Sequence, residues 1–112
     1  MVITFTPPPM VLISVSYEFA LGIPEALRTV LKEAQKPRTD YNPDTGRMTV
    51  TTTIDAGVLE RRLLSLRHRY WNPAFSPRGD LRRKLVHIEN LLVINQLLRC
   101  LSNYYAQQCY RK

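Results

Sequence analysis

A run of basic residues between positions 61 and 84 is the part of this sequence best suited to binding another molecule. Eight residues in the run are Lys or Arg, and seven of those eight are Arg. The planar guanidinium of Arg binds phosphate through two parallel hydrogen bonds and stacks on bases, whereas the Lys ammonium acts as a point charge. The run (the basic ridge) therefore predicts a phosphate-binding surface. It consists of Arg61, Arg62, Arg67, Arg69, Arg78, Arg82, Arg83 and Lys84.

Aromatic side chains are interleaved with these bases. His68, Tyr70, Trp71 and Phe75 all fall inside the run, and proteins that bind single-stranded nucleic acids stack bases on such rings. Tyr70 continues a row of leucines and is expected in the core, so Trp71 is the ring that we add to the predicted site. The alternatives are an acidic protein surface as the partner, or a charged face that is only solvated.

The distribution of charge supports a localised site. Residues 1–56 carry five Lys or Arg against six acids, a net charge of −1, while residues 57–112 carry eleven against three, a net charge of +8. We expect a single domain over residues 1–112, with a neutral N-terminal part and a basic helical part. Such an asymmetry is an electrostatic footprint for phosphate, an acidic protein or an anionic membrane surface. Of these we favour the phosphates of a nucleic acid, and the sequence leaves RNA or DNA open.

Enzymatic chemistry is not predicted. The two histidines, His68 and His87, lie nineteen positions apart, and no acidic pair has a spacing that would aim two carboxylates at one pocket. The sequence has no phosphate-binding glycine loop and no cysteine–histidine pattern typical of a metal site. We therefore expect no catalytic residues, no metal and no cofactor.

The two cysteines and the hydropathy pattern bear on the compartment. Cys100 and Cys109 have no Cys-x-x-Cys spacing, and no apolar run approaches the length needed to cross a bilayer. Three prolines interrupt the apolar start of the chain, which makes it a poor signal peptide. These features predict a cytoplasmic protein with free thiols and no membrane partner.

The first half of the chain alternates between strand and helix patterns. Residues 2–5 and 10–19 are predicted strands, the second with its odd-numbered side chains on a buried face. Gly22 and Pro24 mark a break and the start of a helix, in which apolar residues recur at helical spacing from Ile23 until Pro37 ends the run. The turn sequence at residues 42–46 predicts a hairpin over residues 38–54.

Two helices are predicted in the second half. Asp55 should cap the first, whose buried row is Leu59, Leu63, Leu66 and Tyr70. Ser76 should cap the second, with Pro77 at its first helical position. This last helix is apolar around most of its circumference, and we expect its polar residues to form a thin outward row. That row is Arg82, Glu89, Gln96 and Asn103.

The predicted fold class is α+β, in the order ββαββαα. We expect a small antiparallel or mixed sheet covered on one face by helices, with a long C-terminal helix. That helix carries more apolar surface than the sheet can cover. The second functional interpretation is therefore a non-enzymatic assembly subunit or adaptor that forms a homodimer or docks on a protein partner. Its predicted interface is Leu91, Ile94, Leu98, Leu101 and Tyr105.

Overall fold

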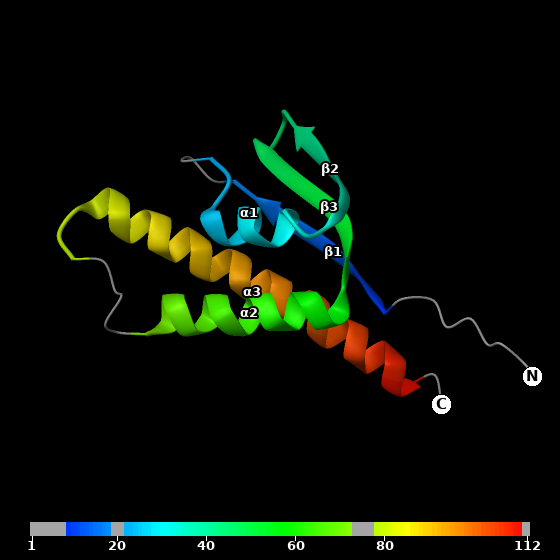
Figure 1. Ribbon diagram of the computed structural model, residues 1–112. Coiled ribbons are helices and arrows are strands. Elements are labelled where there is room, and N and C mark those ends of the chain that lie inside the picture. The colour runs from blue at the N-terminus through cyan, green and yellow to red at the C-terminus, as the bar shows by residue number, and fades with distance from the viewer. Residues whose placement is uncertain (1–8, 19–21, 73–77, 111–112) are drawn as a thin grey trace, which may run out of the picture.

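The computed structural model describes residues 9–18, 22–72 and 78–110, without the side chains of residues 109 and 110, and these residues form an α+β fold (Figure 1). The class and the long C-terminal helix are confirmed. The described order is βαββαα rather than ββαββαα, and the extra strand predicted at residues 2–5 lies outside the described residues. The elements are β1 (Met10–Tyr17), α1 (Glu25–Leu31), β2 (Gln35–Asn42), β3 (Arg47–Asp55), α2 (Ala56–Trp71) and α3 (Leu81–Tyr110).

The three strands form an antiparallel sheet in the order β1-β3-β2. On β1, Val11, Ile13, Val15 and Tyr17 alternate with more exposed residues, as predicted, and they pack into the core with Val50 of β3. All three helices lie to one side of the sheet in Figure 1, where α3 packs along β1 and α1 packs against α3 and α2. Buried apolar residues alternate with more exposed residues along the strands, so the core forms on one face of the sheet.

The β2–β3 hairpin is confirmed, although the segment before it differs from the prediction. Gly46, at a φ of 71°, closes the turn by donating its N–H to the carbonyl of Asn42 over 2.9 Å. Helix α1 ends at Leu31, and Pro37 lies inside β2 instead of ending the helix. A register shift between Gln35 and Arg38 accommodates this proline. A residue without an N–H is tolerated in such a bulge on an edge strand.

Helices α2 and α3 each begin directly after an aspartate. The Asp55 carboxylate accepts the Val58 N–H over 3.1 Å, which confirms the predicted cap of α2. The predicted start of α3 at Pro77 is wrong, because residues 78–80 are not helical and Asp80 accepts the Arg82 N–H over 2.9 Å. Ser76 and Pro77 themselves lie outside the described residues. The Asp80 carboxylate satisfies an amide of the first turn, which otherwise has no partner within the helix.

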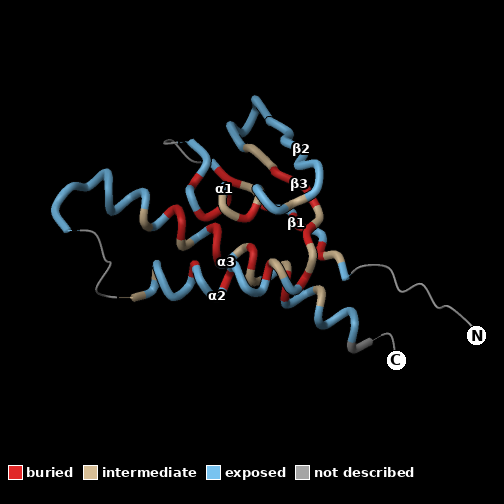
Figure 2. The backbone as a smooth tube through the Cα atoms, viewed as in Figure 1, coloured by how far each residue is buried: buried red, intermediate tan, exposed pale blue. Residues whose placement is uncertain are grey.

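The orientation of α3 differs most from the prediction. Glu89 and Asn90 are buried and Gln96 is half-buried, whereas several leucines of the first three turns are exposed (Figure 2). The predicted outward polar row is therefore wrong at Glu89 and Gln96. Gln96 accepts the N–H of Ser16 over 3.1 Å, and Asn90 accepts the N–H of Ala26 over 2.8 Å. Both side chains face inward because they satisfy backbone donors that would otherwise be unpaired.

Candidate functional site

The basic ridge is divided by the fold. Helices α2 and α3 pack against each other, and the rings of Tyr70 and His87 lie 5.7 Å apart between the end of one and the start of the other. Most of the ridge therefore gathers at one end of the α2–α3 pair, whereas Arg61 and Arg62 lie about two turns earlier on α2. The gathered set (the basic tip) is Arg67, Arg69, Trp71, Arg78, Arg82, Arg83 and Lys84.

Arg62 is engaged by an acid of the same molecule. Its Nε and Nη2 donate to the two carboxylate oxygens of Glu33 over 2.8 and 2.6 Å. This hydrogen bond from Arg62 is the largest cause of the lowered pKa of Glu33, and it also raises the pKa of the guanidinium. Arg62 therefore ties the segment after α1 to α2, and it is a poor candidate for a phosphate contact.

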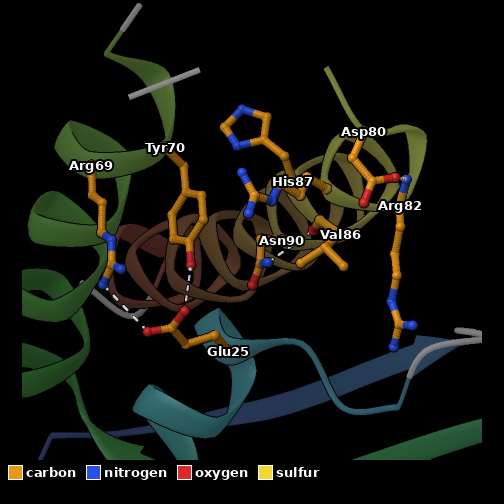
Figure 3. Close-up of a pocket in the computed structure, with 9 residues that line it drawn as sticks. Glu25, Arg69, Tyr70, Asp80, Arg82, Val86, His87 and Asn90 are labelled. Atoms are coloured by element: carbon orange, nitrogen blue, oxygen red, sulfur yellow. Dashed lines mark hydrogen bonds and ion pairs between the residues drawn. The ribbon is translucent and has the colours of Figure 1, made fainter. Parts of the chain in front are cut away.

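Arg69 is also paired, although more loosely. Its Nη1 lies 3.3 Å from a carboxylate oxygen of Glu25, and the hydroxyl of Tyr70 donates to the other oxygen over 3.3 Å (Figure 3). The guanidinium also lies 5.6 Å from the centroid of the Tyr70 ring. Burial, followed by the charge of Glu25, raises the pKa of Tyr70. Tyr70 therefore remains a neutral donor near pH 7. It was predicted in the core, and the structure places it half-buried against the core.

The other bases of the basic tip are exposed. Among the described residues, none of the acids forms an ion pair with Arg67, Arg78, Arg82, Arg83 or Lys84. Trp71 is 43% exposed and borders a shallow hollow together with Leu64, Arg67 and His68. The tip thus presents five charges that are not neutralised within the described residues, beside one accessible indole ring.

A larger hollow of about 740 Å³ opens between α1, α2 and α3 at the same end of the molecule (Figure 3). Three arginines and two acids line it, and Arg82 extends away from the Tyr70–Glu25 pair. The other two arginines, Arg82 and Arg83, line the hollow together with Asp80 and form no ion pair with the described residues. The lining residues are Glu25, Arg69, Tyr70, Asp80, Arg82, Arg83, Val86, His87 and Asn90.

The predicted protein interface is only partly accessible. Ile94 and Leu101 belong to the core, and Leu91 and Leu98 are half-buried, so a partner could reach little of this set. Tyr105 is 43% exposed, and its hydroxyl donates to Glu60 over 2.8 Å. The sequence analysis missed the exposed apolar residues at the start of α3. Their 4-3-4 spacing was the available signal, and they are Leu81, Leu85, Ile88 and Leu92.

Other kinds of site find little support in the described part of the chain. It contains no cluster of three His, Cys, Asp or Glu side chains able to hold a metal ion. None of its helices combines the length and the hydropathy that spanning a bilayer requires. The thiol of Cys100 is free and half-buried, and it lies 3.9 Å from the carbonyl oxygen of Ser14. This contact places Cys100 in a packing role at the edge of β1.

Comparison with known proteins gives no relative from which a role could be transferred. No family model, no curated protein and no solved structure matches this chain.

Proposed function

We propose that this chain is a non-enzymatic nucleic-acid-binding protein that contacts phosphates through the basic tip. The observation that carries the proposal is the gathering of five exposed bases without acid partners among the described residues, beside the exposed ring of Trp71. Arg62 and Arg69 contribute less than the sequence predicts, because each is paired with an acid near α1. The bases release counterions from the phosphate backbone, and Trp71 stacks on unpaired bases.

Charge reversal at the tip tests this proposal. Changing Arg67→Glu and Arg83→Glu should weaken binding of a twenty-nucleotide single strand, RNA or DNA, by at least about tenfold at low salt. The logarithmic salt dependence should fall by roughly 1.4, since each lost phosphate contact on a single strand contributes about 0.7. Trp71→Ala should weaken single-strand binding and leave duplex binding nearly unchanged.

The matched control reverses two exposed bases of similar type away from the tip. Lys32→Glu with Lys36→Glu makes the same change in net charge in the segment after α1, and it should reduce binding only slightly. Equal losses from the two pairs would show that net charge alone matters. The proposal also fails if the unmodified protein does not retain either nucleic acid at low ionic strength.

A second candidate function is an assembly subunit, and a specific observation favours it. The first three turns of α3 expose a row of large apolar side chains beyond the part of the helix that packs on β1. Apolar residues grouped in this way on a small protein are typical of a protein contact. Light scattering of the isolated protein over a range of concentrations tests for self-assembly, and it requires no nucleic acid.

A further inference from the structure

The apolar row of α3 consists of Leu81, Leu85, Ile88 and Leu92. These side chains are 79%, 41%, 51% and 50% exposed, respectively. Their 4-3-4 spacing places them on one face of the helix, as in the seam of a coiled coil. In Figure 1 the start of α3 extends past the sheet, and Figure 2 shows these turns as mainly exposed. The row is therefore open to a partner helix.

We propose that the apolar row binds the same row of a second copy of this chain, with the two helices antiparallel. The proposal rests on the second candidate function and specifies its partner. In this arrangement Leu81 packs against Leu92 of the partner subunit, and Leu85 packs against Ile88 of the partner subunit. The two-fold axis repeats both contacts, so all four apolar residues of each helix are used and none faces a polar residue.

The charges beside the row favour the antiparallel direction. The same face of α3 continues with Asn95 and Arg99, so a parallel pair would place Arg99 opposite Arg99 of the partner subunit. A parallel pair would also bring together the bases of both tips, including Arg82 and Lys84. The antiparallel pair separates these like charges along the helix axis, which removes that repulsion.

Glu89 supports a partner helix that brings a cationic side chain beside it. It is 7% exposed, and it forms no ion pair or hydrogen bond with any residue that the structure describes. A carboxylate that has no partner within the described residues can accept a cationic side chain. Arg82 and Glu89 lie on the same flank of the apolar row, seven residues apart. In the antiparallel pair, Arg82 of the partner subunit approaches Glu89, and the reverse pair forms by symmetry.

Light scattering tests the dimer in the absence of nucleic acid. Four apolar layers make a small interface, so we expect a reversible dimer with a dissociation constant of about 1–100 µM. Leu85→Ser with Ile88→Ser should weaken the dimer at least tenfold without loss of helical circular dichroism, because both side chains are exposed. The control Leu64→Ser with Tyr41→Ser removes two side chains that are 60% and 61% exposed elsewhere, and it should leave the dimer unchanged.

Cysteine crosslinking tests the register and the direction. In a background in which Cys100 and Cys109 are replaced by Ser, a mixture of the Leu85→Cys and Ile88→Cys proteins should crosslink under mild oxidation faster than either protein alone. A parallel pair would instead crosslink Ile88→Cys to itself most quickly. That result would overturn the proposal, as would a protein that stays monomeric at about 200 µM or a dimer insensitive to Leu85→Ser with Ile88→Ser.

A pair of charge variants tests the contact with Glu89. Arg82→Glu should weaken the dimer at least fivefold, because it places two carboxylates together. Arg83→Glu makes the same change in net charge on the opposite side of α3, and it should change the dissociation constant less than twofold. Equal weakening by both variants would overturn the proposed contact. Failure of nucleic-acid binding affects none of these outcomes, so the two functions are tested separately.

Discussion

Single side chains in this protein have roles that differ from those their residue types suggest. Arg62 and Arg69 belong to an arginine-rich run, yet both bind acids near α1. Asn90 is a polar residue on a long helix, yet it is buried and accepts the Ala26 N–H at the start of α1. In each case the partner lies at least 29 positions away in sequence. Local spacing carries no information about such pairs.

The Arg62–Glu33 pair predicts a pH dependence of stability. The pKa of Glu33 is lowered from 4.5 by the hydrogen bond from Arg62, so the ionised carboxylate favours the folded state. The stabilisation is present above the ordinary carboxyl pKa, and it is lost as the pH falls through the lowered value. Glu33→Gln should therefore lower the melting temperature at pH 7, and the difference from the unmodified protein should shrink as the pH falls below the ordinary carboxyl pKa.

Thermal unfolding followed by circular dichroism between pH 7 and pH 3 measures this difference. Asp44→Asn is the control, since Asp44 is exposed in the β2–β3 turn and forms no ion pair with the described residues. Its effect on the melting temperature should be small and nearly independent of pH. A Glu33→Gln difference that does not shrink between pH 7 and pH 3 would contradict the proposed role of the charge.

At the scale of the elements, the sequence predicted the strands and α2 well. In residues 10–17 and 47–55 one face is mainly apolar, and the structure buries the predicted faces, including Thr52, while Leu12 lies on the exposed face of its strand. Helix α3 was harder because apolar residues surround it, so periodicity could not identify its buried side. The buried side of α3 is determined by its contact with the sheet. Helix α3 packs along β1, and Gln96 accepts the Ser16 N–H at the edge of that strand. The basic tip was predicted only as a run, since the packing of α2 on α3 determines which bases gather.

The contact between Gln96 and β1 predicts a local change in hydrogen exchange. Gln96→Ala leaves the Ser16 N–H without its acceptor at the half-buried edge, so this amide should exchange faster while the amides paired with β3 change less. The variant should also lose about 1–3 kcal/mol of unfolding free energy, because a donor is left unsatisfied.

Amide exchange measured by nuclear magnetic resonance tests the prediction. Gln107→Ala is the matched control, since Gln107 lies on the same helix, is exposed and borders the same hollow beside β1. It should leave the exchange of Ser16 and the unfolding free energy nearly unchanged. Equal acceleration by the two variants would show that Gln96 has no specific role at this edge.

At the scale of the whole molecule, the two proposed surfaces share the start of α3. The apolar row faces one way, and the bases of the tip flank it on the same turns. In the proposed dimer, Leu81 of each copy lies beside Leu92 of the other, so each of the α3 bases Arg82, Arg83 and Lys84 lies about five to nine residues from its own copy along the helix axis. At 1.5 Å per residue this separation is roughly 8 to 14 Å. It corresponds to about two to four phosphate steps of 3.4 Å along one strand of a duplex.

This spacing predicts that affinity depends on the length of the nucleic acid. A dinucleotide reaches only one tip, whereas an oligonucleotide of about fifteen nucleotides can contact both. The second contact is then intramolecular, so the affinity rises by more than the number of sites explains. At protein concentrations above the dimer dissociation constant, the longer oligonucleotide should bind at least about tenfold more tightly per site. Leu85→Ser with Ile88→Ser should abolish this gain while each tip keeps its affinity for the short oligonucleotide. Fluorescence anisotropy with both lengths measures the effect, and a length dependence that survives in the monomeric variant would show that the two tips act independently.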